Sequence, residues 1–174
     1  MVRAFLSLGS NIEPEKNMVE AIRCLARRVK VLRTSTVYLT EPLLHRDQPA
    51  YYNCVLEIET EIDPYILKFN VLRVIEQDLG RKRTADKYAS RTIDIDIIVY
   101  GNQLISKGDL VLPDPDIDKR AFLALPLCEI QPDLVLPRQN KPICEIAARF
   151  EKHSMKELKV FSKRLKSLIA GLSV

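Results

Sequence analysis

The stretch RTIDIDIIVY, residues 91–100, carries the clearest structural signal in the chain. It is rich in β-branched residues, and acidic and apolar side chains alternate through its first half, which predicts a strand over 92–100. Successive side chains of a strand point to opposite faces of the sheet. We therefore expect Asp94 and Asp96 on one face and the isoleucines around them on the other.

The segments before this strand predict the rest of one sheet and its helices. Alternating or β-branched runs predict strands over 3–9, 30–39 and 52–60, and apolar residues at steps of three and four predict helices that begin at Pro14 and Pro64. The order strand, helix, strand, strand, helix, strand is the split βαβ arrangement. We expect an α+β fold, a ferredoxin-like βαββαβ sandwich in which helices cover one face of an antiparallel sheet.

The segments after this strand predict additions to the sandwich. A turn at Gly101-Asn102 should lead into a hairpin arm, and a short helix is expected near 118–124, followed by proline-rich coil. Helices are then expected near 142–150 and 154–170. The last helix has an apolar stripe opposite its lysines, for which packing onto the domain is the first expectation and a dimer contact the second.

Length and composition describe an ordinary globular protein. The chain has 174 residues, 47% hydrophobic and 29% charged, which suits a single core. We expect one domain over 1–148, followed over 149–174 by a basic amphipathic helix packed on it. That final segment has a net charge of +5, which leaves −1 on the rest of the chain, so a basic nucleic-acid groove over the whole domain is not indicated. No apolar run approaches the roughly 20 residues of a membrane span, and we expect a cytoplasmic protein.

The cysteines and histidines carry little functional signal. Cys24, Cys54, Cys128 and Cys144 lie among apolar neighbours with no C-x-x-C spacing, which predicts buried free thiols rather than a zinc site or a disulfide framework. The two histidines are too few for a histidine-based metal cluster.

Asp94 and Asp96 form the first candidate functional feature. Two carboxylates on one face of a strand repel each other and raise each other's pKa. Such a pair suits a divalent cation, and Mg2+ prefers oxygen ligands of this kind. An edge strand that carries two exposed acids by chance is the alternative. The apolar character of the remaining strand and the basic segment before it favour a metal site.

The segment over 80–91 is polar, lacks an apolar period and is expected to form a loop. It carries five basic residues, Arg81, Lys82, Arg83, Lys87 and Arg91. Phosphoryl transfer needs metal ions and cationic side chains around the phosphates, and arginine binds phosphate through two parallel hydrogen bonds. A solvated charge run is the alternative. Because the chain has neither a GxxxxGK[ST] nor a GxGxxG motif, ATP would have to bind through magnesium and these cations.

Arg81-x-Arg83 followed by RTIDID over 91–96 resembles the signature of the 6-hydroxymethyl-7,8-dihydropterin pyrophosphokinase family, whose members are folate-pathway enzymes. The resemblance extends from about Ala4 to Pro137. It includes further motifs in matching order: Gly9-Ser10-Asn11, Tyr38-Leu39-Thr40-Glu41-Pro42, Tyr51-x-Asn53, Leu79-Gly80-Arg81, Arg120-x-Phe122 and Pro126-Leu127-x-Glu129-Ile130. The resemblance implies Mg2+-dependent transfer of diphosphate from ATP to the hydroxymethyl group of the pterin, with release of AMP.

The resemblance also implies a role for individual residues. The catalytic residues would be Arg81, Arg91, Asp94 and Asp96, with the two aspartates holding two Mg2+ ions that bridge the ATP phosphates. ATP would further be bound by Glu76, Arg83, Ile97 and Arg120. The pterin would be bound by Thr40, Leu43, Tyr51, Asn53 and Phe122, where Tyr51 and Phe122 enclose the ring between their aromatic faces.

The chain departs from the family pattern at a few positions. Asp114 stands where the family often has histidine, Tyr88 where it often has tryptophan, Thr84 where it has a basic residue and Arg73 where it has a polar one. A catalytically weakened member is therefore one alternative, and a ferredoxin-like nucleic-acid-binding module is another. The partners we expect are the pterin and ATP, with no nucleic acid and no membrane, in a monomer or weak homodimer.

Overall fold

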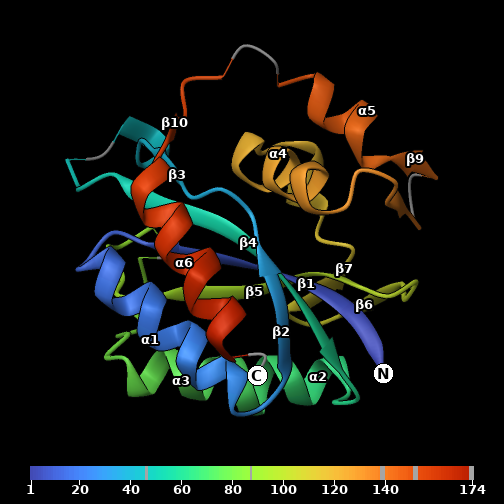
Figure 1. Cartoon of the computed structure of the whole chain (residues 1–174), viewed down its shortest axis with the longest axis horizontal. Coiled ribbons are helices and arrows are strands. Elements are labelled where there is room, and N and C mark those ends of the chain that lie inside the picture. Colours follow the sequence, from blue (N-terminus) through green and yellow to red (C-terminus); the bar gives the residue numbers. More distant parts are fainter. Residues whose placement is uncertain (46, 87, 138–139, 151–152, 173–174) are drawn as a thin grey trace.

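The computed structural model describes residues 1–45, 47–86, 88–137, 140–150 and 153–172 (Figure 1). Its centre is an antiparallel sheet in the order β10-β3-β4-β1-β5, and β2 pairs with the far half of β4. The mixed α+β class with an antiparallel sheet is therefore confirmed. The strands of this sheet are β1 (Val2–Ser10), β2 (Lys30–Thr34), β3 (Tyr38–Thr40), β4 (Tyr51–Thr60), β5 (Asp94–Tyr100) and β10 (Lys156–Glu157).

Helices pack on both faces of this sheet, so the expectation that helices would cover only one face was wrong. Successive side chains of β1 enter two different apolar clusters, because alternate residues of a strand face opposite ways. One cluster receives side chains from α1 (Pro14–Ala26), η2 (Leu67–Leu72), α3 (Arg73–Asp78) and α6 (Lys159–Leu172). The other receives them from α4 (Ala121–Ile130) and α5 (Ile143–Ala148), which Figure 1 shows on the far side of the sheet from α1 and α6. No helix within the described residues is both long and apolar enough to cross a bilayer.

Two predicted boundaries were wrong. The strand expected over 30–39 is broken, since Thr34 lies opposite Leu56 but Tyr38 lies opposite Asn53, so the pairing register changes between them. The helix expected to end near 124 continues to Ile130 as α4, so the first part of the expected proline-rich coil, with Pro126, is helical. A proline inside a helix loses one backbone hydrogen bond, and here the apolar burial along α4 outweighs that loss.

The remaining elements are short. The predicted turn at Gly101-Asn102 is confirmed: it follows β5 and leads into the hairpin arm. The arm consists of β6 (Ile105–Lys107) and β7 (Leu110–Leu112) and itself turns at Gly108, where φ is +55°. The first turn of the second long helix is α2 (Pro64–Ile66), which begins at the predicted proline. The other short elements are η1 (Leu43–His45), η3 (Pro115–Asp118), β8 (Val135–Leu136) and β9 (Lys141–Pro142).

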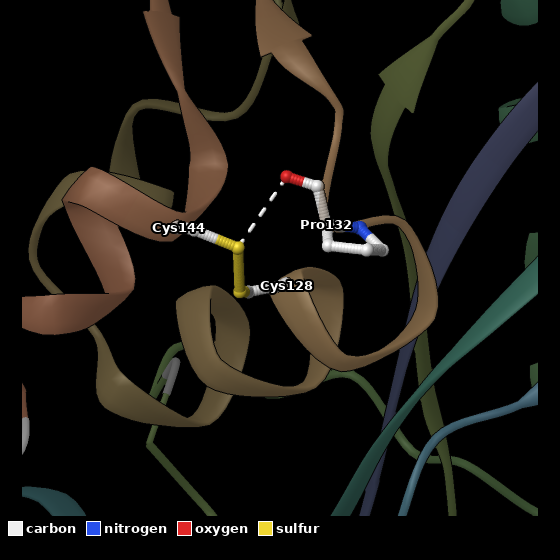
Figure 2. The surroundings of a disulfide bond; sticks show 3 residues. All are labelled: Cys128, Pro132 and Cys144. Atoms are coloured by element: carbon white, nitrogen blue, oxygen red, sulfur yellow. Dashed lines mark hydrogen bonds between the residues drawn. A yellow bond between two sulfur atoms is a disulfide. The ribbon is translucent and has the colours of Figure 1, made fainter.

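Cys128 and Cys144 form a disulfide that joins α4 to α5, so the expectation of free thiols was wrong for these two residues (Figure 2). The Cys144 sulfur also lies 3.3 Å from the carbonyl oxygen of Pro132. The two sulfurs meet because α4 and α5 pack against each other, and this contact leaves no mark in the cysteine spacing. Cys24 and Cys54 are free, as predicted, but only Cys54 is buried, whereas Cys24 is partly exposed.

Candidate functional site

Two cavities meet where β5 begins. One is lined by β1, β3, β4 and the start of α4, and the other by the basic loop over 81–91 and the hairpin arm. Arg91, Asp94 and Asp96 line both cavities. This shared wall is the candidate functional site. The cationic side chains of the second cavity are Lys68, Arg73, Arg81, Lys82, Arg83 and Arg91, set against the carboxylates of Asp86, Asp94, Asp96 and Asp109.

The two aspartates lie at the start of β5 and on the same side of it. Asp94 lies opposite Gly9 and Asp96 opposite Ser7 in β1. The alternating Ile95 and Ile97 are buried in the core. The strand periodicity therefore placed both carboxylates on one face of β5, as expected, and this face lines both cavities.

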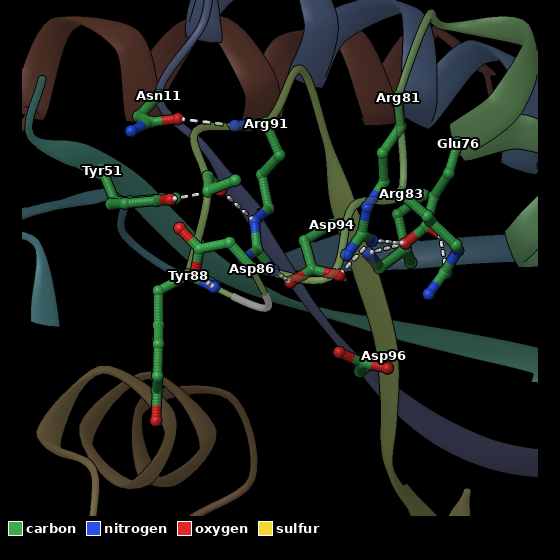
Figure 3. Close-up of polar contacts among 12 residues, drawn as sticks. Asn11, Tyr51, Glu76, Arg81, Arg83, Asp86, Tyr88, Arg91, Asp94 and Asp96 are labelled. Carbon is green, nitrogen blue, oxygen red and sulfur yellow. Dashed lines mark hydrogen bonds and ion pairs between the residues drawn. The ribbon is translucent and has the colours of Figure 1, made fainter. Parts of the chain in front are cut away.

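A buried carboxylate organises the arginines around Asp94 (Figure 3). Glu76, 2% exposed, forms ion pairs with Arg81 at 2.5 Å and with Arg83 at 2.7 Å, and accepts a hydrogen bond from the Ile95 N–H at 2.8 Å. Burial raises the pKa of Glu76, although the Ile95 N–H and Arg81 oppose the shift. Desolvation lowers the pKa of Arg81, but the carboxylates of Asp94 and Glu76 outweigh it, so the guanidinium stays charged.

Asp94 is held from two directions. Its Oδ1 pairs with Arg81, and its Oδ2 accepts a hydrogen bond from Arg91 at 2.5 Å. Arg81 follows Gly80, whose φ of +80° turns the chain sharply after α3. Arg91 reaches the same carboxylate from the other end of the loop. The two ends of the loop over 81–91 therefore converge on one carboxylate. Lys87, which the sequence analysis counted among the basic residues of this loop, lies outside the described residues.

Asn11 anchors the loop to the sheet, a role that the sequence analysis did not assign. Its side-chain oxygen accepts from the Arg91 N–H at 2.9 Å, and its Nδ2 donates to the carbonyl of Pro49 at 3.1 Å and to Ser90 Oγ at 3.2 Å. Asn11 is 4% exposed. The Gly9-Ser10-Asn11 motif was the only sign in the sequence that this segment has a function. The contact itself depends on Arg91, which lies 80 positions further along the chain.

Asp96 is less well compensated than Asp94. The nearest cation in the part of the chain that the structure describes, Lys68 Nζ, lies 3.7 Å away, and Figure 3 shows the Asp96 side chain apart from the arginine network. Burial raises the pKa of Asp96 to about 6, with further contributions from the charges of Asp94 and Asp114, against the opposing effect of Lys68. A carboxylate pair whose charge the protein leaves partly unbalanced fits a divalent cation with oxygen ligands.

All five residues that were predicted to bind the pterin are found in the wall of the first cavity: Thr40, Leu43, Tyr51, Asn53 and Phe122. Asn53 Nδ2 donates to Thr40 Oγ1 at 2.7 Å, which fixes the orientation of its amide. Gly9 is required here by close approach, since a Cβ at this position would lie 2.9 Å from Asn53 Oδ1. The Tyr51 hydroxyl lies 3.4 Å from the carbonyl oxygen of Ala89, which brings this aromatic ring next to the loop.

Three residues that were predicted to bind ATP do not line either cavity. Glu76 lies behind the arginines, the side chain of Ile97 is 3% exposed in the core, and Arg120 pairs with Asp116 at 3.8 Å. Conversely, Lys68 and Asp109 line the second cavity although the sequence analysis assigned them no role. Lys68 falls within the helix predicted from Pro64 and Asp109 within the predicted hairpin arm, and only packing brings these two segments to the site.

Comparison with known proteins adds sequence and structural relatives. Residues 5–132 match the family described as "7,8-dihydro-6-hydroxymethylpterin-pyrophosphokinase (HPPK)". The chain is 37% identical to the Haemophilus influenzae protein named 2-amino-4-hydroxy-6-hydroxymethyldihydropteridine pyrophosphokinase, over 91% of this chain and 99% of that protein. It is 36% identical to the Pneumocystis carinii folic acid synthesis protein fol1, over 94% of this chain but only 22% of that longer protein.

Solved structures agree in fold. A Plasmodium falciparum HPPK-DHPS triple mutant with SDX-DHP superposes with a TM-score of 0.68 at 15% identity, over 86% of this chain and 44% of that one. A P. falciparum HPPK-DHPS wild type with pteroate superposes with a TM-score of 0.69 at 14% identity, over 86% of this chain and 42% of that one. At such low identity the superposition speaks for the fold alone.

Proposed function

The chain belongs to the 7,8-dihydro-6-hydroxymethylpterin-pyrophosphokinase family, and on that premise we propose that it transfers diphosphate from ATP to the hydroxymethyl group of 6-hydroxymethyl-7,8-dihydropterin, with release of AMP. The observation that supports this most directly is the meeting of the two cavities at Arg91, Asp94 and Asp96. One cavity has an amide and aromatic side chains suited to a flat heterocycle. The other has the cations that a polyphosphate needs.

We assign two Mg2+ ions to Asp94 and Asp96. Bound there, they would supply Lewis-acid stabilisation of the charge on the phosphate oxygens. Within the described ranges, no group of three or more His, Cys, Asp or Glu side chains could hold a metal, so the aspartates would need phosphate or water oxygens to complete the coordination.

The protein's own contribution is positioning and charge. Tyr51 and Phe122 would enclose the pterin ring, and Asn53, oriented by Thr40, would bind its polar edge. Arg81 and Arg91 would exchange part of their contact with Asp94 for the phosphate oxygens, and stabilise the charge that develops as the hydroxymethyl oxygen attacks the β-phosphorus. Glu76 would hold Arg81 and Arg83 in place. Closure of the loop over 81–91 would exclude water, the competing nucleophile.

The remaining assignments rest on the same premise. Ile97 would contact ATP through its main chain, since its side chain is buried, and Arg120 would contact ATP after leaving Asp116. Leu43 would line the pterin cavity. We also propose the ferredoxin-like description of the sheet, the division of the chain at residue 148, a cytoplasmic location and a monomer or weak homodimer.

A catalytically weakened member is the second candidate, and Asp114 is the observation that favours it. This acid lines the first cavity, and its negative charge raises the pKa of Asp96. It accepts a hydrogen bond from the Asp116 N–H at 2.8 Å, which ties the carboxylate to η3. An acid in this position would repel phosphate unless a cation lies between them.

Formation of AMP from ATP tests the proposal. The reaction is run with excess Mg2+, with and without the hydroxymethyl-dihydropterin, and again with EDTA. We expect AMP only when both pterin and metal are present. Folded protein that binds ATP and pterin but forms no AMP would favour the weakened member, and binding of single-stranded RNA without either substrate would favour the nucleic-acid module.

A further inference from the structure

A π turn lies in the helix beside the candidate metal site. Over Leu67–Leu72 the helix widens, and the Arg73 N–H donates to the carbonyl oxygen of Lys68, five residues earlier. In a regular α-helix, residues five apart point about 140° away from each other. The wider turn brings Lys68 and Arg73 closer to one side of the helix. Single π turns inside α-helices are often found at functional sites.

Both side chains that leave this turn reach the hairpin arm. Lys68 Nζ donates to the carbonyl oxygen of Asp109 at 2.6 Å, and Arg73 pairs with the carboxylate of Asp109 at 3.2 Å. The Arg73 guanidinium also lies 4.1 Å from the centre of the Phe69 ring. These contacts tie Asp109 of the arm to the π turn, and Lys68, only 16% exposed, lies with Asp109 in the wall of the second cavity.

Lys68 differs from the arginines of this cavity in how it meets its carboxylate. Arg81 and Arg91 are hydrogen-bonded to Asp94, whereas Lys68 lies 3.7 Å from Asp96, beyond hydrogen-bond distance. An ammonium group has three donors on a flexible stem. Of these three cations, Lys68 is the one that can leave its carboxylate without breaking a hydrogen bond to it.

We propose that Lys68 is an exchangeable cation of the nucleotide site: it partly neutralises Asp96 in the free protein and donates to the phosphate chain once ATP and its divalent cation are bound. The identity of the nucleotide rests on the proposed function. The exchange itself requires only a polyanion and a divalent cation that occupy the second cavity together.

This exchange predicts opposite effects on two ligands. Lys68 repels a divalent cation at Asp96, so its removal should strengthen binding of the metal alone. It donates to phosphate, so its removal should weaken binding of the nucleotide. A residue that merely supports the helix or the arm would weaken both when it is replaced.

Titration calorimetry on Lys68→Met, Lys68→Arg and the wild-type chain separates these cases. Two probes are used. The first is Mn2+ alone, which replaces Mg2+ because both ions prefer six oxygen ligands in an octahedral arrangement. The second is a non-hydrolysable ATP analogue at a fixed concentration of Mg2+. For Lys68→Met we expect roughly tenfold weaker binding of the analogue, as for one lost charge-assisted hydrogen bond, and several-fold tighter binding of Mn2+. Lys68→Arg should restore the affinity for the analogue to within about threefold of wild type.

Lys16→Met is the matched control, because Lys16 is 67% exposed and pairs only with Glu13 among the described salt bridges. It should leave both affinities unchanged. Unchanged analogue affinity in Lys68→Met overturns the inference, and so does weaker or unchanged Mn2+ binding. Absence of analogue binding to the wild-type chain overturns it too. A chain that binds the analogue but forms no AMP contradicts the proposed function instead, and the binding titrations still decide the role of Lys68.

Discussion

Replacement of Asp96 by asparagine should stabilise the metal-free protein at neutral pH. Burial and the neighbouring acids raise the pKa of this carboxyl from 3.8 to about 6, which corresponds to roughly 3 kcal/mol of unfavourable free energy when it is ionised. The side chain is 44% exposed, so water screens part of this, and we expect about 1–2 kcal/mol. For a chain of this length the melting temperature should rise by about 2–8 °C.

The sign of the pH dependence follows from the direction of the shift. A carboxyl with a raised pKa binds more protons in the folded state than in the unfolded one, so its unfavourable contribution is fully present above about pH 6 and disappears as the pH falls toward 3.8. The advantage of Asp96→Asn should therefore be largest at pH 7.5 and small at pH 4.5.

Thermal unfolding in EDTA at these two pH values measures the effect, with Asp133→Asn at an exposed position as the control. Added Mg2+ should then raise the melting temperature of the wild-type chain more than that of Asp96→Asn, because the variant has lost a ligand. The reasoning is refuted if Asp96→Asn is less stable than wild type at pH 7.5 in EDTA, or if its advantage is the same at both pH values.

Three further changes test other parts of the site and fold. Arg81→Ala should lower kcat by about 100- to 1,000-fold, as for a lost transition-state cation, with a small change in pterin KM; a change confined to pterin KM would contradict its assigned role. Asn11→Ala should lower the free energy of unfolding by about 1–3 kcal/mol, since it removes the hydrogen bonds by which this buried side chain holds the loop, and urea denaturation beside the exposed Asn102→Ala should show this loss only for Asn11. Reduction of the Cys128–Cys144 disulfide should lower stability by about 3 kcal/mol for a loop of this size, and a Cys128→Ser/Cys144→Ser variant that is insensitive to dithiothreitol provides the control.

Much of the architecture could be predicted because it depends on local periodicity. Alternation places Asp94 and Asp96 on one face of β5 and the isoleucines beside them in the core, since successive side chains of a strand point to opposite faces. Proline marked the starts of α1 and the Pro64 helix. The class of the fold and the placement of both acids on one face of their strand were thus available from the sequence.

Other features depend on contacts between segments that are far apart in the sequence, and they were missed because local periodicity does not report such contacts. The disulfide requires α4 to lie on α5, the Asn11 anchor spans 80 positions, and Pro126 stays within α4 because burial on the second face outweighs a lost hydrogen bond.

The sequence by itself therefore determined the strand that carries the two carboxylates, the basic loop that precedes it and the family resemblance. Only the tertiary structure decided that Glu76 lies behind the arginines and that Lys68, on a π turn, lies 3.7 Å from Asp96. The physical reason is that periodicity reports the direction of a side chain relative to its own element, whereas a charge is balanced by groups from elements that only packing brings together.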